Sequence, residues 1–485
     1  MIHSFEYCLE KVKDVGIVEE VKGSLVFVSG FKKASVGEGV TFETGEHGEI
    51  ISLNRELTEI LIFSRNPINS GVRVARTGDQ LSVTVGEGLL GHIVNALGYT
   101  LDSKRQDSIK SELRRVEAAA GDISGRKRVD GFLETGVSVV DLAVPLGLGQ
   151  RELVIGDRKT GKTSFLLQTV LSQARKERVC VYALVGKRKS EVIEVRNFLK
   201  KNKVMDYSII VAAFADDSPG EIYMAPFTAM TIAEYFRDAG VDSLVVIDDL
   251  TTHAKYWREI SLVGGRFPGR ESYPGDIFYL HSKLLERAGN FKVDGKDASI
   301  SCLPVAEAPA GDITGYIQTN LMSMTDGHIF FDSELFFKGY RPAVNIFLSV
   351  TRVGKQTQPP LFRDMGKEIL TLLKRNEEME RFLRFGPEVT PMAAKILRQG
   401  QRLYSFFNQM PQVSVPVNLS AVLTALIRSD DWDGKNAEVF SKAYAEEPRY
   451  KMLVDGLVSR AEGFEKFVKD VQALKEKLKK PLKEK

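Results

Sequence analysis

The sequence predicts three domains: an N-terminal β-barrel, a central α/β core with a mainly parallel sheet, and a C-terminal α-helical domain. Three observations support this fold class. Short strand-like runs fill the first 80 residues, apolar strands then alternate with amphipathic helices, and helical patterns dominate from about residue 358. The predicted ranges are 1–80, 81–358 and 359–485, and 485 residues suit a chain of about two to four domains.

Short β-rich runs bounded by glycine or polar residues mark the N-terminal domain. They span residues 24–30, 39–45, 48–53 and 59–63. A spacing of about ten residues between such runs suits a small antiparallel barrel or sandwich. We interpret the domain as a barrel made of strands and turns.

In the core, near-continuous runs of Val, Ile and Leu alternate with helical segments. The runs cover 151–155, 178–185, 207–213 and 242–247, and helical stretches cover 164–175 and 190–201. This alternation indicates a parallel sheet covered on both faces. The C-terminal helices end in a lysine-rich segment, 474–485. We expect it to be a solvated, frayed helix end rather than a lipid-binding surface, because acids interrupt its cations.

Composition excludes several classes of protein. The 67 basic and 64 acidic side chains nearly balance, so the net charge of +3 gives no support for nucleic-acid or membrane-surface binding. Cys8, Cys180 and Cys302 lie too far apart for a metal-ligand spacing or a disulfide framework, which favours a reducing compartment. No apolar run approaches the roughly 20 residues that cross a bilayer. We therefore expect no nucleic-acid partner and no direct insertion into a membrane.

Residues 156–163 match the phosphate-binding pattern G-x-x-x-x-G-K-[ST]. Its glycines let backbone N–H groups point at phosphate oxygens, and Lys162 adds a positive charge for the terminal phosphates. The hydroxyl of Thr163 can bind Mg²⁺, and the strand before the loop and the helix after it provide the required context. The predicted phosphate-binding residues are Gly156, Asp157, Arg158, Lys159, Thr160, Gly161, Lys162, Thr163 and Ser164.

The apolar strand at 244–247 ends in two carboxylates, Asp248 and Asp249. Downstream of a phosphate loop, such a strand end favours a carboxylate that holds a magnesium-bound water. We choose Asp248 because the first acid after the strand lies nearest the carboxyl edge of the sheet. The sequence thus predicts a bound nucleotide with Mg²⁺.

A self-sufficient ATPase would also need a carboxylate after the strand that follows the loop helix, to position the attacking water. Three cations, Lys187, Arg188 and Lys189, stand there instead. The nearest acid, Glu191, falls at the start of the next helix, an end that acids favour. We therefore predict a tightly held nucleotide and poor intrinsic hydrolysis.

At this point the chain resembles the alpha subunits of F-type ATP synthases. The resemblance runs from about residue 16 to the C-terminal helices. It is carried by the segments 149–153, 156–164, 246–250, 268–282, 325–330 and 338–345. It implies a barrel, a RecA-like nucleotide core and a helical domain. It also implies a non-catalytic subunit that binds Mg-ATP, whereas the beta subunits carry the catalytic glutamate at the position matching Lys187.

The resemblance also implies roles for single residues. Arg352 falls where the family has an arginine finger that serves the catalytic site of the neighbouring beta subunit. Lys159 stands where alpha subunits usually carry glutamine. Residues that resemble those around the nucleotide base are Phe336, Arg341, Pro342, Gln409 and Gln412.

The implied partners are beta subunits in an alternating hexamer, a central rotor shaft and a peripheral stalk. The short segment before residue 16 leaves the stalk contact open. Such a complex couples ion-gradient-driven rotation to ATP synthesis or hydrolysis, on the cytoplasmic face of a bacterial plasma membrane or the matrix or stromal face in an organelle. Two alternatives are an alpha-like paralogue in a non-synthase machine and a self-sufficient hexameric ATPase or helicase. Lys187 and the near-neutral charge disfavour the second.

Overall fold

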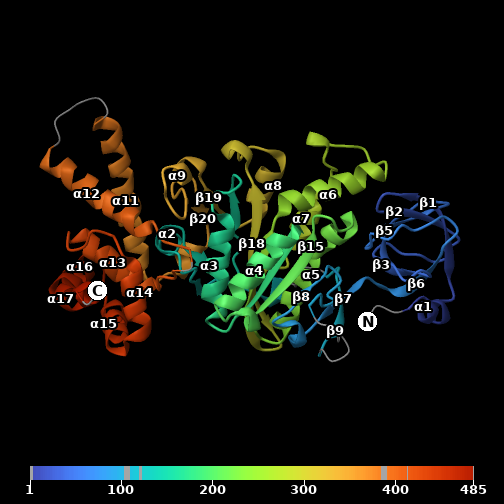
Figure 1. Cartoon of the computed structure of the whole chain (residues 1–485), viewed down its shortest axis with the longest axis horizontal. Helices are drawn as coiled ribbons and strands as arrows, with labels where there is room; N and C mark the ends of the chain where they lie inside the picture. The colour runs from blue at the N-terminus through green and yellow to red at the C-terminus, as the bar shows by residue number, and fades with distance from the viewer. Residues whose placement is uncertain (1–3, 103–109, 119–122, 384–389, 412, 484–485) are drawn as a thin grey trace. The chain divides into compact units, whose positions relative to one another are not determined.

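The computed structural model describes residues 4–102, 110–118, 123–383, 390–411 and 413–483 (Figure 1). They belong to two compact units, each built from segments far apart in the chain. The first unit comprises residues 1–128, 174–307 and 313–325, and the second comprises 129–173, 308–312 and 326–485. The N-terminal strands thus lie in the first unit, and the phosphate loop and the C-terminal helices lie in the second.

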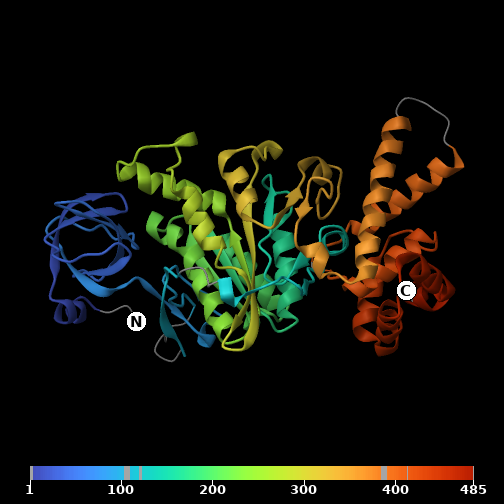
Figure 2. The ribbon, with the colours of Figure 1, turned by 180° about the vertical axis from the view of Figure 1, so that it is seen from behind.

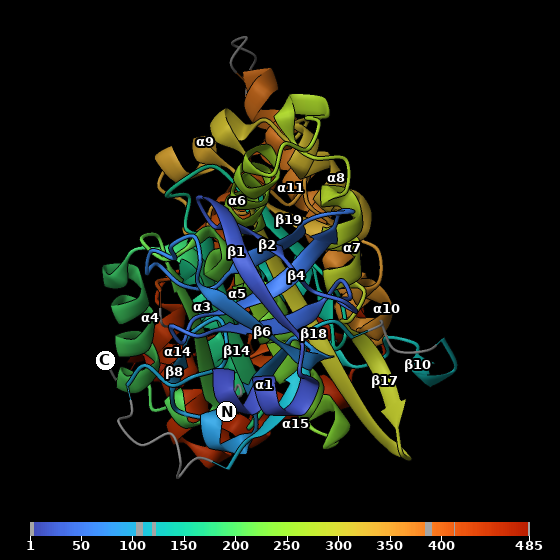
Figure 3. The same cartoon turned by 90° about the vertical axis from the view of Figure 1, so that its right-hand side faces the viewer.

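Six antiparallel strands close into a barrel at the N-terminus (Figure 3). They are β1 (Val15–Lys22), β2 (Leu25–Ser29), β3 (Glu38–Phe42), β4 (His47–Leu53), β5 (Thr58–Ile62) and β6 (Arg73–Gln80), in the order β1-β2-β5-β4-β3-β6. Val18, Phe42, Ile50 and Ile60 are fully buried in its core. Closure leaves no open sheet edge. The structure therefore confirms a barrel rather than a sandwich.

A helix precedes the barrel, where we predicted only strands and turns. Helix α1 (Phe5–Val12) is capped by Ser4, whose hydroxyl accepts a hydrogen bond from the Tyr7 N–H at 3.3 Å. Phe5 and Cys8 are buried against Ala75 of β6. A helix of eight residues is marginal by itself, so burial on the barrel stabilises it. That contact is not visible in the local sequence.

The first unit also holds five parallel strands in the order β18-β16-β14-β15-β8. They are β18 (Lys296–Glu307), β16 (Ser243–Asp248), β14 (Val179–Lys187), β15 (Ser208–Phe214) and β8 (Ile93–Val94). Helices α4 (Lys189–Lys201), α5 (Pro219–Asp238) and α6 (Leu250–Val263) pack on these strands. Every residue of β16 is buried, as expected for a strand covered on both faces. The predicted α/β pattern is confirmed.

The second unit contains the loop strand and the C-terminal helices (Figure 2). Strand β13 (Leu153–Gly156) runs parallel to β19 (Gly327–Phe331), and β20 (Val350–Thr351) is antiparallel to β19. The helices are α2 (Ser138–Ala143), α3 (Lys162–Ala174), α9 (Ser333–Phe337), α10 (Gly354–Thr357), α11 (Pro360–Leu383), α12 (Pro391–Phe407), α13 (Val417–Arg428), α14 (Ala437–Glu446), α15 (Pro448–Ser459) and α16 (Phe464–Ala473). Across the described ranges, no helix is both long and apolar enough to cross a membrane.

Shorter elements complete both units. In the first unit these are β7 (Ser82–Val85), β9 (Glu112–Arg115), β10 (Arg126–Lys127), β17 (Gly289–Val293), α7 (Ile277–Leu285) and α8 (Tyr316–Met324). In the second unit they are β11 (Phe132–Leu133) and β12 (Leu146–Gly147). The pairs β7–β9, β10–β17, β17–β18 and β11–β12 are antiparallel, so the mainly parallel sheet carries antiparallel additions.

The lysine-rich C-terminal segment is docked, so the prediction of a frayed end is wrong. It forms α17 (Lys475–Leu478) and α18 (Lys480–Lys483). Leu478 is fully buried, and its carbonyl accepts a hydrogen bond from the Tyr450 hydroxyl at 3.1 Å. The ammonium of Lys475 lies 2.9 Å from the Asp431 carboxylate. Buried apolar residues, Leu478 and Pro481, and polar contacts together attach this segment to the helical domain.

Two histidines form a buried pair in the first unit. Nδ1 of His253 on α6 lies 3.1 Å from Nε2 of His281 on α7, and Nε2 of His253 lies 3.0 Å from the Tyr223 carbonyl oxygen. Burial lowers the pKa of His253 to about 4, and burial together with His253 lowers the pKa of His281 well below its usual value. Both rings are therefore neutral at pH 7.

We expect His253→Gln to make the fold less sensitive to acid. Below pH 6.5 the unfolded chain protonates this ring while the native chain does not, so native stability falls as the pH drops from 6.5 towards 4. The loss is about 1.4 kcal/mol per pH unit for each such histidine, and glutamine at 253 removes one of the two. Urea midpoints at several pH values measure the difference between wild type and variant.

Other titrating groups contribute equally to wild type and His253→Gln, so their effects cancel in the difference. Some of these groups stabilise the native state as the pH falls. Burial raises the pKa of Glu49 to about 8, for example, and this carboxyl is present in both. Parallel loss of stability in wild type and variant would show that the native pKa of His253 is not depressed.

Candidate functional site

The phosphate loop connects β13 to α3 and is held in shape by its own hydrogen bonds. The Thr160 hydroxyl donates to the Asp157 carbonyl at 2.7 Å, and the Asp157 carboxylate accepts from the Arg158 N–H at 2.7 Å. The Lys162 ammonium donates to the carbonyls of Gly156 at 2.9 Å and Asp157 at 2.6 Å. The ammonium of Lys162 is therefore held against the backbone of the loop by these two hydrogen bonds.

Two glycines of the loop serve different purposes. A Cβ on Gly156 would lie 2.4 Å from the Phe331 carbonyl oxygen on β19, so glycine is needed for this close approach. Gly161 has open space around it but a φ of +99°, which side chains other than hydrogen disfavour. Helix α3 then begins at Lys162, and the N-terminal end of a helix suits an anion because its first N–H groups and the helix dipole favour negative charge.

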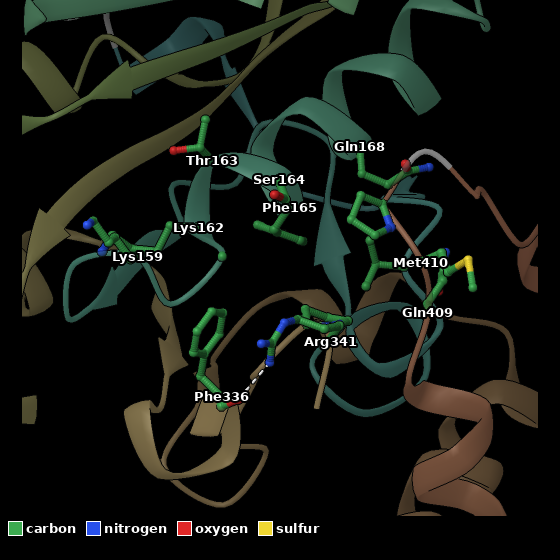
Figure 4. Close-up of a pocket in the computed structure, with 14 residues that line it drawn as sticks. Lys159, Lys162, Thr163, Ser164, Phe165, Gln168, Phe336, Arg341, Gln409 and Met410 are labelled. Atoms are coloured by element: carbon green, nitrogen blue, oxygen red, sulfur yellow. Dashed lines mark hydrogen bonds between the residues drawn. The ribbon is translucent and has the colours of Figure 1, made fainter. Parts of the chain in front are cut away.

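A cavity of about 380 Å³ lies beside this loop within the second unit (Figure 4). The predicted residues that line it are Lys159, Gly161, Lys162, Thr163, Ser164, Phe336, Arg341, Pro342 and Gln409. Four predicted residues shape the loop without lining the cavity: Gly156, Asp157, Arg158 and Thr160. Gln412 lies outside the described residues. The structure thus brings the phosphate loop together with three segments distant in sequence.

Sequence reasoning missed five lining residues: Val137, Phe165, Gln168, Met410 and Pro411. A helical signal could have found one of them, because Gln168 lies four residues after Ser164 and so on the same face of α3. Phe165 directly follows Ser164, and Met410 and Pro411 directly follow Gln409, so adjacency in the sequence could have suggested these three. Val137 reaches the cavity only through tertiary folding.

Arg341 and Phe336 form one wall of the cavity. The Arg341 guanidinium carbon lies 3.5 Å from the centre of the Phe336 ring. Nη1 of Arg341 also donates to the carbonyl oxygens of Phe336 and Tyr340, each at 2.7 Å. Stacking and hydrogen bonds together fix the guanidinium, so this wall is preorganised.

Gln409 lies next to this wall, and all polar atoms of its side-chain amide are hydrogen-bonded. Its Nε2 donates to the carbonyl oxygens of Gly136, at 2.7 Å, and Val413, and its Oε1 accepts from the Ser138 N–H at 3.1 Å. Its backbone N–H donates to the Arg341 carbonyl at 2.6 Å. Gln409 therefore connects the segment after α12 to the start of α2.

In the first unit, Lys187 binds both acids at the end of β16. Its Nζ lies 2.8 Å from Oδ1 of Asp248 and 3.0 Å from Oδ2 of Asp249. The Tyr182 hydroxyl donates to Asp248 at 3.3 Å, and the Thr252 N–H donates to Asp249 at 2.6 Å. Burial alone would lower the pKa of Lys187, but the two carboxylates outweigh it and raise that pKa, so the ammonium stays charged.

Glu191 has the structural role that the sequence suggests. It is the third residue of α4, and its carboxylate accepts a hydrogen bond from the Arg188 N–H at 2.9 Å. This hydrogen bond satisfies the backbone N–H of the residue that precedes the helix. The nearest acid after β14 is thus occupied in stabilising a helix.

Arg352 follows β20 and does not line the cavity. Its backbone N–H donates to the Asp326 carbonyl at 3.0 Å, while the Asp326 carboxylate binds the Arg151 guanidinium at 2.8 Å. Burial raises the pKa of Glu152 well above its usual value, and the bond from Gln150 and the charge of Arg352 oppose this only in part. The Arg352 residue itself is exposed.

Comparison with known proteins agrees with this geometry. Residues 136–351 match the model described as ATP synthase alpha/beta family, nucleotide-binding domain. ATP synthase subunit alpha of Ehrlichia ruminantium (strain Gardel) is 41% identical over 408 residues, which span 82% of this chain and 80% of the relative. The chain belongs to the alpha-subunit family of F-type ATP synthases.

Other members of the alpha-subunit family are similarly related. The proteins named ATP synthase subunit alpha from Anaplasma marginale (strain Florida) and Rickettsia bellii (strain OSU 85-389) are each 40% identical to this chain. The matches cover 82% and 83% of this chain, and 80% of each relative. Membership confirms the family resemblance, the fold class and ATP binding as the class of function.

Proposed function

We propose that this chain is the non-catalytic, Mg-ATP-binding subunit of a rotary ATP synthase. The loop 156–164 would hold the phosphates, with Lys162 supplying positive charge. Phe336, Arg341, Pro342 and Gln409 would enclose the rest of the nucleotide, together with Gln412 if the family pattern extends to it. The geometry that supports this assignment is the convergence of loop and walls on one cavity.

The observation that carries the non-catalytic assignment is the ion pair of Lys187. An ammonium bound to Asp248 and Asp249 stands where a self-sufficient ATPase needs a water-activating carboxylate. A protonated amine cannot accept a proton from water, and Glu191 is engaged in capping α4. These contacts support slow intrinsic turnover of the bound nucleotide.

The residues fit a magnesium ion that arrives with its nucleotide. In the part of the chain that the structure describes, no group of three or more His, Cys, Asp or Glu side chains could hold a metal ion. Mg²⁺ keeps several waters and binds through phosphates and one or two protein oxygens, so such a cluster is not required. We assign direct contact to the Thr163 hydroxyl and a contact through water to Asp248. The bound ion would neutralise phosphate charge.

We assign Arg352 to the catalytic site of a neighbouring beta subunit. Support for this assignment comes from the family pattern and from the position of Arg352, which is exposed and lies outside its own chain's cavity. The partners proposed are beta subunits in an alternating hexamer, a rotor shaft and a peripheral stalk. The assembly would couple ion-driven rotation to ATP synthesis or hydrolysis at the surface of a coupling membrane.

The purified chain should bind Mg-ATP and hydrolyse it negligibly. Equilibrium dialysis measures the binding, and phosphate release over hours measures the turnover. Sustained ATPase activity from the chain alone would overturn the non-catalytic assignment and favour a self-sufficient hexameric ATPase. Lack of any ATP binding would overturn the nucleotide site itself.

A further inference from the structure

One side chain that lines the cavity, that of Gln168, has buried polar atoms without a hydrogen-bond partner in the protein. Gln168 on α3 lines the cavity and is only 4% exposed. Its amide oxygen and amide nitrogen are both buried without a hydrogen-bond partner. Among the described residues, it is the only side chain with two such atoms. Since buried polar groups are nearly always paired, an orphaned amide beside a binding cavity indicates a missing ligand group.

The position of Gln168 indicates which part of a nucleotide it would meet. Figure 4 shows it on the same side as Gln409 and Met410, with Lys159 and Lys162 on the other side. It lies six residues after Lys162 on α3, about 9 Å farther along the helix axis. A nucleotide with its phosphates on the loop would therefore place its base near Gln168.

Gln409 is not available for the same task. Both N–H groups of its amide are donated to backbone carbonyls, and its oxygen accepts from the Ser138 N–H. Turning this amide toward a base would break three hydrogen bonds and take the side-chain donor away from the Gly136 and Val413 carbonyls. Gln168, in contrast, would gain hydrogen bonds without losing any.

We infer that Gln168 recognises the base of the bound nucleotide as adenine. Its amide oxygen would accept from the 6-amino group, and its amide nitrogen would donate to the adjacent ring nitrogen. Glutamine and adenine present matching donor and acceptor pairs, which is how glutamine selects adenine in DNA. The inference rests on the proposed function, because it requires the phosphates on the loop 156–164.

The surroundings of Gln168 allow its amide to turn. The terminal torsion of glutamine is broad, so the amide can rotate while the helix backbone stays in place. A Cβ on Gly136 would lie 3.5 Å from its Nε2, so the amide packs beside a residue without a side chain. Gly136 has a φ of +74°, which favours glycine at this position.

The test compares ATP with purine riboside triphosphate, which lacks the 6-amino group, and uses tripolyphosphate as a phosphate-only probe. The wild-type chain should bind ATP at least about tenfold more tightly than purine riboside triphosphate, because the analogue leaves a buried acceptor unpaired. Gln168→Met should bring this ratio close to one and leave the affinity for tripolyphosphate unchanged. Its Tm should equal or exceed that of the wild type, because a methionine has no amide to leave unpaired.

Gln173→Met is the matched control on the same helix. The amide of Gln173 donates to the Glu134 carbonyl at 2.6 Å, so this variant should lose Tm and keep the nucleotide ratio. Gln168→Leu provides a second substitution at the proposed position. If both Gln168 variants keep the wild-type ratio of the affinities for ATP and purine riboside triphosphate, the inference is overturned. If their Tm is also lower than that of the wild type, Gln168 has a packing role instead. Failure of the wild type to bind either ATP or tripolyphosphate overturns the proposed function as well.

Discussion

Lys162→Ala should weaken ATP binding by this chain about 100-fold. The ammonium donates to the Gly156 and Asp157 carbonyls of the loop. In the proposed complex it would instead make charge-assisted hydrogen bonds to the phosphates. Each such bond contributes roughly 1.5–3 kcal/mol, and about 2.7 kcal/mol corresponds to a hundredfold change in Kd. Isothermal titration of the purified chain with Mg-ATP measures this loss.

Lys159→Gln is the charge-matched control for Lys162→Ala. Both lysines line the cavity, but only Lys162 donates to the Gly156 and Asp157 carbonyls of the loop. We expect Lys159→Gln to weaken binding within about tenfold, as a less closely placed charge should. If Lys162→Ala binds ATP as tightly as the wild type, the loop is not the phosphate site.

Arg352→Lys, assembled with a beta partner, should lower the turnover of the complex about 1,000-fold. An arginine finger contributes about 10³–10⁵ in rate where it has been measured in GTPases, because its planar guanidinium stabilises charge on the transferring phosphoryl group. Lysine keeps the charge but loses the bidentate geometry, so the lower end of that range applies. Steady-state ATPase assays of the reconstituted complex measure the effect.

Arg363→Lys is a suitable control, because it makes the same exchange at an exposed residue of α11. The nucleotide content of this chain should stay at the wild-type level in the Arg352 variant, since Arg352 lies outside the cavity. Turnover equal to that of the wild type would instead assign Arg352 to the local packing around Asp326 and Glu152.

The parts of the site that were predictable are those encoded in adjacent residues. The phosphate loop, its strand and its helix are contiguous, and the chemistry of Lys162 and Thr163 follows from their places in the pattern. The barrel and the α/β core were predictable for the same reason, since hydrophobic periodicity is local. Lys187 was predicted to follow its strand and is instead the last residue of β14, and its partners were not foreseen.

What was missed depends on contacts between distant segments. The ion pair of Lys187 with Asp248 requires β14 and β16 to be neighbours, which the sequence of neither strand specifies. The orphaned amide of Gln168 becomes evident only when the segment after α12 covers α3. The docked C-terminal segment depends on Leu478 finding a site on the helical domain. Single-sequence patterns carry little information on such pairings.

The division of each unit among separate chain segments has a consequence for biosynthesis. All six barrel strands have left the ribosome once residue 80 emerges, so that module can close early. Strand β16, however, must wait for β18, which ends at Glu307. At about 5–20 residues per second, β16 stays without this neighbouring strand for about 3–12 s of synthesis. Molecular chaperones should therefore engage this polypeptide during translation, after the barrel has formed.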